Sequence, residues 1–148
     1  MRVHLRVLGV LALVASAAAC DESLSTVPSP TPTLEPTFSS IQRNIFDAGD
    51  ANGRPACVSC HTNVGQIPGG GLVLLASVSY GNLVNRASVQ QTSVLRVAPN
   101  NPDASYLVRK ISGTPGINGL RMPLNGPYLT SEQIQVIRTW IQQGAQNN

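Results

Sequence analysis

The chain has 148 residues, 42% of them hydrophobic, and a formal net charge of +3. This length suits one domain and is too short for two independent hydrophobic cores. The Lys and Arg residues form no basic stripe, and from Cys20 onward eight of them nearly balance seven Asp and Glu residues, so nucleic acid is not expected as a partner. Only six residues are aromatic, which predicts either a modestly stable fold or a non-protein group at its centre.

Residues 1–19 are predicted to be an export signal peptide. Arg2 and Arg6 provide a positively charged start, and the apolar and small residues at 7–19 form a run too short to span a membrane. The rest of the chain is therefore expected to be exported, to the periplasm or the cell surface.

Residues 20–37 are predicted to be a linker, and Cys20 at its start is a candidate lipid anchor. The three alanines before this Cys resemble the lipobox of bacterial lipoproteins, although Leu or Val is usual where Ala17 stands. Ordinary signal-peptidase cleavage after Ala19 is the alternative. Ser, Thr and Pro dominate residues 23–37, which therefore stay extended and suit a tether that holds a domain near a membrane.

The remaining chain, 38–148, is predicted to be a mainly α-helical domain with a loop-rich middle. The apolar spacing predicts a first helix over residues 39–48, with Gly49 as its end. Gly and Pro residues predict a loop from 50 to 71 that encloses another group.

The middle of the domain carries weaker signals. The short apolar runs at 71–75 and 93–97 are expected to pair as a small two-stranded hairpin, with a helical turn at 80–85 between them. The Asn-Pro pair at 101–102 is typical of a helix start, so a helix is expected over residues 102–111.

The clearest predicted element is the last helix, which follows the Gly-rich loop at 112–127. Thr130 and Gln133 match a capping box at its start, and Gly144 is expected to end it. Its apolar stripe consists of Ile134, Ile137, Trp140 and Ile141. Of these, Trp140 is expected to lie where the first and last helices meet.

The chemistry of the sequence is concentrated in the segment Cys57-Val58-Ser59-Cys60-His61, because C-x-x-C-H is the attachment signature of haem c. Two cysteines three residues apart on one turn reach the two vinyl groups of one porphyrin. The adjacent histidine reaches the iron from the same side. The segment therefore predicts one covalent haem c, attached through Cys57 and Cys60, with His61 as the proximal iron ligand.

Three other uses of this segment compete with haem attachment. A zinc site needs a fourth ligand, and after the signal the sequence offers no further His and only Cys20 as a further Cys. A thioredoxin-like redox pair needs a βαβ context, which the sequence does not predict. A disulfide between Cys57 and Cys60 would close a small, strained loop. Export favours haem, since haem c is attached outside the cytoplasm.

From Phe38 to Ala145 the chain resembles a class I monohaem c-type cytochrome. The matching features are an N-terminal helix, C-V-S-C-H, a distant Met122-Pro123 in a loop and an amphipathic C-terminal helix. The later segments S-Y-L-V-R-K and W-I are similar to those of haem-c domains in exported bacterial proteins. The resemblance implies that the terminal helices cross and that a loop-rich middle encloses the haem. The stretch 61–122 is longer than in compact members of the family.

Met122 is the predicted distal ligand of the iron. After the signal, His61 and Met122 are the only His and Met residues, so two His ligands from one chain are excluded. Met122, Lys110 or an open position remain, and ordinary packing is the alternative role for Met122. Ligation by Met122 is favoured because this residue lies between Gly-rich loops and before Pro123. His/Met ligation raises the reduction potential and leaves no open position on the iron, so an enzyme is not expected.

Secondary roles are predicted for several polar residues. The candidate cations for the haem propionates are Arg109, Lys110 and Arg121. The tyrosines expected in the haem-pocket wall are Tyr80, Tyr106 and Tyr128. The carbonyl of Pro68 is a candidate acceptor for the Nδ1 proton of His61.

The sequence as a whole predicts an exported protein that transfers electrons to and from redox partner proteins through one covalent haem c. Two alternatives remain open. One is the haem domain of a larger redox enzyme, and the other is a lipoprotein whose haem senses redox state or binds a gas.

Overall fold

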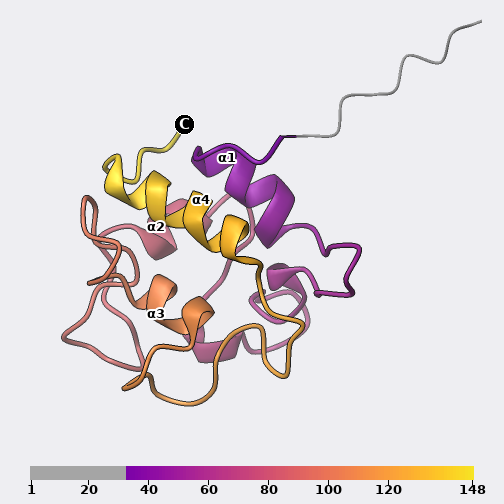
Figure 1. The fold of residues 1–148 in the computed structure, drawn as a ribbon. Coiled ribbons are helices and arrows are strands. Elements are labelled where there is room, and N and C mark those ends of the chain that lie inside the picture. Colours follow the sequence, from indigo (N-terminus) through magenta and orange to yellow (C-terminus); the bar gives the residue numbers. More distant parts are fainter. Residues whose placement is uncertain (1–32) are drawn as a thin grey trace, which may run out of the picture. The chain divides into compact units, whose positions relative to one another are not determined.

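The computed structural model describes residues 33–148 (Figure 1). The predictions for the signal at 1–19, for Cys20 and for the linker up to residue 32 lie outside these residues. The described helical segments are α1 Phe38–Ile41, η1 Gln42–Phe46, η2 Cys57–Ser59, η3 Gly69–Gly71, α2 Ser79–Leu83, α3 Tyr106–Ser112 and α4 Ser131–Gln142. Within residues 33–148 there is no strand, only two isolated β-bridges, so the described chain leans helical and is compatible with the predicted mainly helical fold. None of the helices in this range has the length and apolar character that crossing a membrane requires.

The first helix is a continuous segment made of α1 and η1. The side chain of Thr37 accepts a hydrogen bond from the Ser40 N–H at 3.3 Å and thereby caps the N-terminus. The last turn is π-helical, since the Asp47 N–H donates to the Gln42 carbonyl five residues back at 2.8 Å. The helix lies where the sequence predicts it but ends at Phe46, two residues before the predicted end.

Aromatic side chains join the two terminal helices, which Figure 1 shows side by side. The ring of Phe38 lies 5.4 Å from the ring of Trp140, 5.2 Å from that of Tyr80 and 6.5 Å from that of Phe46. Trp140 is only 1% exposed, and its indole N–H donates to the Gln146 carbonyl at 2.8 Å. The predicted position of Trp140 between the terminal helices is therefore confirmed.

Helix α4 forms with the boundaries that its capping residues predict. The Thr130 hydroxyl accepts from the Gln133 N–H, and the Gln133 side chain accepts from the Thr130 N–H, which completes the capping box. At the other end Gly144 has a φ of +97°, and the Ala145 N–H donates to the Trp140 carbonyl at 2.9 Å. This is a Schellman-type end, for which Gly is the favoured residue.

The predicted hairpin between residues 71–75 and 93–97 is wrong. The second run instead makes single bridges with residues 84–87, joining Val97 to Val84 and Leu95 to Ala87. The first run is held elsewhere: the Leu74 N–H donates to the His61 carbonyl at 2.8 Å, and the Leu74 carbonyl accepts from the Gln42 side chain at 2.9 Å. Because both backbone groups of Leu74 are satisfied in this way, the run cannot also pair as a strand.

Helix α3 begins four residues later than the predicted start at residue 102. The Asn101 side chain caps a turn by accepting from the Ala104 N–H at 3.0 Å, as its type suggests. The helix does not follow at once, because Ser105 is extended and its hydroxyl donates back to the Asn101 carbonyl at 2.9 Å. The predicted helical turn at 80–85 is present in the form of α2.

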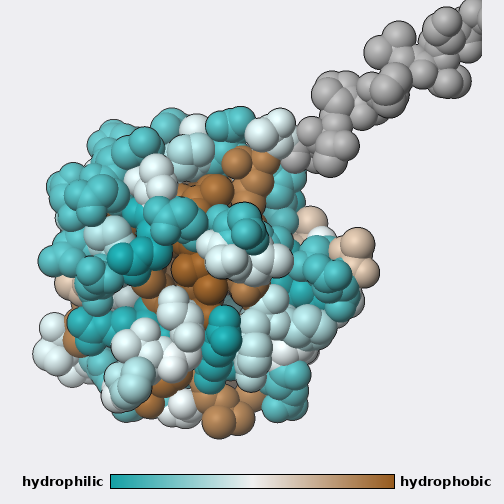
Figure 2. All heavy atoms as spheres, viewed as in Figure 1, coloured by the Kyte–Doolittle hydropathy of each residue, from teal (hydrophilic) through white to brown (hydrophobic). Residues whose placement is uncertain are grey.

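Hydrophilic side chains cover most of the face drawn in Figure 2, and hydrophobic ones gather near its centre. The buried core joins residues of the first helix, α3 and α4 with Leu74, Leu83 and Val97 from the middle of the chain. This packing brings the loop-rich middle against the helices, and a cavity lies where they meet.

Candidate functional site

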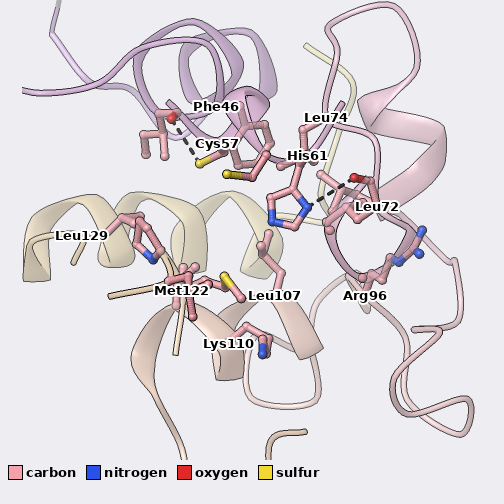
Figure 3. A pocket seen from close by; sticks show the side chains of 18 of the residues that line it. Phe46, Cys57, His61, Leu72, Leu74, Arg96, Leu107, Lys110, Met122 and Leu129 are labelled. Atoms are coloured by element: carbon pink, nitrogen blue, oxygen red, sulfur yellow. Dashed lines mark hydrogen bonds between the residues drawn. The ribbon is translucent and has the colours of Figure 1, made fainter. Parts of the chain in front are cut away.

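All four residues that the sequence predicts around the iron line one cavity of about 260 Å³ (Figure 3). Cys57, Cys60 and His61 come from η2 and the turn after it, whereas Met122 comes from the loop between α3 and α4. Most of the other lining residues are apolar, and they include residues of η1, the segment 72–83 and α3 together with Ile137 of α4. The fold therefore brings the C-x-x-C-H segment and the distant methionine to the same apolar space.

The C-x-x-C-H segment is a tight turn pinned to the end of the first helix. The His61 N–H donates to the Cys57 carbonyl at 2.9 Å, and the Cys57 thiol donates to the Ile45 carbonyl at 3.4 Å. Burial raises the pKa of the Cys57 thiol. Both Cys57 and Cys60 are free thiols, and Cys60 is the more exposed of the two. The two sulfur atoms therefore lie beside the cavity on one turn, as the motif predicts.

Arg54 fixes this turn to the helix, and the sequence analysis missed it. The residue is 1% exposed, and its guanidinium donates to the carbonyls of Ile45, Ala48 and Pro55 at 2.9–3.1 Å. Its Nε atom also pairs with Asp50 at 3.3 Å. A cation that satisfies carbonyls at a helix C-terminus is favourable there. Nothing in the sequence marks it as buried, because the partners are backbone groups.

The imidazole of His61 points into the cavity, and a backbone carbonyl holds its orientation (Figure 3). Its Nδ1 atom lies 3.3 Å from the Leu72 carbonyl. A carbonyl oxygen can only accept, so Nδ1 carries the proton and Nε2 keeps its lone pair. Burial lowers the pKa of His61, and the nearby cations Arg96 and Lys110 lower it further, whereas backbone hydrogen bonds oppose them. The ring is therefore held neutral, which is the state a metal requires.

The predicted partner of His61 Nδ1, the Pro68 carbonyl, is wrong. That carbonyl accepts from the Gly71 N–H at 3.0 Å and so closes the η3 turn. The η3 turn reverses the chain and brings the Leu72 carbonyl to the ring instead. The type of partner was predictable from the chemistry of ligating histidines, but its position depends on the path of this loop.

Met122 enters the cavity from a loop that α3 supports. The Met122 N–H donates to the Lys110 carbonyl at 2.9 Å, and Figure 3 shows its sulfur turned toward the space beside His61. Lys110, the competing ligand, is 8% exposed, and its ammonium donates to the Asn118 and Leu120 carbonyls at 2.9 and 2.7 Å. The thioether of Met122 has no such bonds to break before it can bind a metal.

The cations that line the cavity differ from the three that the sequence predicts. Lys110 and Arg96 line it, and the sequence analysis missed Arg96, whose guanidinium is fixed by the Asn82 and Gly71 carbonyls at 2.9 and 3.1 Å. The other two predicted cations are outside the lining. Arg109 donates to the Asp103 carbonyl, and Arg121 lies over the Tyr128 ring at 4.1 Å.

Only one of the three predicted wall tyrosines lines the cavity. Tyr106 does so, and its hydroxyl accepts from the Asn118 N–H at 3.0 Å. Tyr80 belongs to the aromatic cluster and donates to the Ala145 carbonyl, and Tyr128 is half exposed under Arg121.

In the part of the chain that the structure describes, the charged side chains that line the cavity are all positive. Two cations, Arg96 and Lys110, line it, and no Asp or Glu from residues 33–148 does. The same residues contain no group of three or more His, Cys, Asp or Glu side chains arranged to hold a metal ion.

No family model, curated protein or solved structure matches this chain.

Proposed function

We propose that this chain is an exported electron-transfer protein with one covalent haem c. Cys57 and Cys60 carry the thioether bonds, His61 is the proximal ligand, and Met122 is the distal ligand. The observation that supports this most is the convergence of the C-x-x-C-H turn and Met122 on one apolar cavity, with the His61 ring turned into it. The motif alone predicts attachment, and the shared cavity supports Met122, from a distant loop, as the second axial ligand.

The lining of the cavity fits a haem in two further respects. A porphyrin is a flat, largely apolar group with two carboxylates at one edge, and the described lining is mostly apolar, with two cations and no acid. A compensating cation makes burial of a carboxylate less costly. Arg96 and Lys110 are therefore the residues that would balance the propionates, in place of the predicted trio of Arg109, Lys110 and Arg121.

The side chains of the protein would perform three tasks toward this group. The Leu72 carbonyl holds the proton of His61 on Nδ1, so that Nε2 remains a donor to the metal. The thioether of Met122 favours ferrous over ferric iron, and the apolar lining keeps water away. When bound, the haem supplies reversible exchange of one electron.

The proposed His/Met ligation disfavours alternatives in which the iron itself binds a substrate or a gas. An enzyme or a gas sensor needs an open position on the iron, and Met122 would fill that position. The haem domain of a larger redox enzyme would use the same residues for the same electron transfer, so it differs only in the partner protein.

A spectrum of the exported full chain tests the proposal. We expect haem that stays with the polypeptide after denaturation, a low-spin spectrum in both oxidation states, and the weak near-infrared sulfur-to-iron band in the ferric form. The Cys57→Ala/Cys60→Ala variant should carry no covalent haem, whereas a Cys20→Ser control should keep the wild-type spectrum. Wild-type protein without covalent haem would overturn the proposal.

We also propose that Cys20 is lipidated and that the predicted linker tethers the domain to a membrane, up to the residues at its end that contact the domain, Leu34, Glu35 and Thr37. The proposal rests on the A-A-A-C sequence and the Pro-rich stretch that follows it. Cys20→Ser should release haem protein into the soluble fraction, as measured by fractionation. Soluble wild-type protein that begins with an unmodified Cys20 would contradict it.

A further inference from the structure

Lys110 is bonded to the Met122 loop through both its side chain and its backbone. The ammonium donates to the carbonyls of Asn118 and Leu120, which flank Gly119, at 2.9 and 2.7 Å. The Lys110 carbonyl accepts from the Met122 N–H at 2.9 Å. One residue of α3 therefore contacts three positions within five residues of loop, and the last of them carries the proposed ligand.

Other bonds also define the path of this loop: the Gln91 side chain donates to the Gly116 carbonyl at 2.6 Å, and the Asn118 side chain donates to the Gln90 carbonyl. Gly113, Gly116 and Gly119 all have positive φ angles, +71°, +85° and +71°, so its course depends on residues with wide conformational freedom. Its Leu120 side chain is 63% exposed and packs little. The Asn118 N–H and the Arg121 Nε make single bonds to the Tyr106 hydroxyl and the Ile111 carbonyl. The bond of Arg121 and the two bonds of the Lys110 ammonium are charge-assisted, and of these two side chains only that of Lys110 binds two carbonyls of the loop.

From these contacts we infer that Lys110 is the positioning residue for Met122: it holds the loop so that the thioether stays in the cavity and on the proposed iron. The inference rests on the proposed function, because it concerns a residue that acts through the distal ligand. It assigns Lys110 a role other than the ligand role that the sequence left open. A cation at this place stabilises the loop best, since its ammonium reaches both carbonyls at once.

The test compares three variants with equal covalent haem content. Lys110→Leu removes both bonds, and we expect it to lose most of the near-infrared sulfur-to-iron band and to bind carbon monoxide in the ferrous state. Lys110→Arg keeps a cation of similar reach and should recover part of the band. Arg109→Leu removes the neighbouring cation, whose Nε donates to the Asp103 carbonyl, and should match the wild type in both measurements.

The outcomes separate this inference from the proposed function. If Lys110→Leu keeps the full band and resists carbon monoxide as the wild type does, the inference is wrong and the proposed ligation stands. If Met122→Ala keeps the wild-type band, the proposed ligation itself fails. Should Lys110→Leu accumulate no haem protein, Lys110→Gln decides, because its shorter amide cannot reach both carbonyls, and a wild-type band in that variant would overturn the inference.

Discussion

The surroundings of Met122 support its proposed role as an iron ligand over a packing role. It is absent from the buried core cluster, it lies in a loop, and its sulfur faces the cavity. A methionine kept only for packing normally fills a gap between core side chains. Pro123, with its fixed φ, stiffens the backbone directly behind it.

Replacing Met122 should therefore change the iron rather than the fold. We expect Met122→Ala to lose the near-infrared band, to lower the reduction potential substantially and to bind carbon monoxide. Met122→His should give a bis-His spectrum, because imidazole donates to ferric iron more strongly than a thioether. Absorption spectra and a potentiometric titration measure these changes. An unchanged low-spin spectrum and potential in Met122→Ala would make Met122 a packing residue.

Residue types and counts were enough to predict the proposed ligands, but not their surroundings. Cys57, Cys60 and His61 follow from a contiguous motif, and Met122 follows from being the single methionine after the signal. The cations of the cavity wall could not be found in this way. Arg96 and Arg109 look alike in sequence, and only the path of the chain turns one toward the cavity and the other toward the Asp103 carbonyl.

At the scale of elements, the end of the first helix sets the position of the C-x-x-C-H turn. The chain bends between the end of this helix and the turn. The fully buried side chain of Arg54 donates hydrogen bonds to carbonyls on both sides of this bend. The Asp50 carboxylate completes the arrangement by accepting from the backbone N–H groups of Asn52 and Arg54 at 2.9 and 3.1 Å. The bend therefore depends on one buried cation and one partly exposed anion.

Removing the buried cation should destabilise the protein markedly. Arg54→Met keeps the apolar stem but leaves three carbonyls without their donor and Asp50 without its ion-pair partner, at a cost of about 3 kcal/mol. Urea unfolding of haem-containing protein measures the loss, and Arg43→Met, on an exposed site of the first helix, is the matched control. A variant as stable as the control would show that water replaces the guanidinium there.

Asp50 should make stability depend on pH in the acid range. Burial pushes its pKa up, but hydrogen bonds from Arg54 and Asn52 and the charge of Arg54 leave the pKa below the ordinary 3.8. Its contribution to stability is therefore present above about pH 4 and is lost as the pH falls through the lowered pKa. In urea titrations from pH 6 down to 2.5, Asp50→Asn should lose less stability than the wild type. Parallel curves for the two proteins would contradict this.

Elements with local signals were predictable, and those fixed by distant contacts were not. Helix α4 follows from Thr130, Gln133 and Gly144, all of which act within a few residues. The predicted hairpin failed because Leu74 bonds to His61 and to Gln42, which is 32 residues away. No pattern within residues 71–75 reveals such a partner.

At the scale of the molecule, four of the six aromatic residues form one cluster beside the cavity. Phe38, Phe46, Tyr80 and Trp140 pack together between the terminal helices, and of these only Phe46 also lines the cavity. The wall formed by the segment 69–74, α3 and the Met122 loop contributes mostly aliphatic and Gly residues, with Tyr106 as its aromatic side chain. The aromatic cluster and this aliphatic wall therefore adjoin a cavity that their own side chains do not fill.

This division predicts that the haem completes the core and that folding depends on it. The Cys57→Ala/Cys60→Ala variant, exported without haem, should show no cooperative thermal transition, because a group that binds the folded state alone contributes its binding energy to folding. Circular dichroism at a far-ultraviolet and a near-ultraviolet wavelength measures this, with Cys20→Ser as the haem-containing control. The aromatic cluster would leave some helix in the variant, but the aliphatic wall has too little to bury by itself. A haem-free variant that melts sharply, with both wavelengths changing together, would mean that the polypeptide closes the cavity unaided.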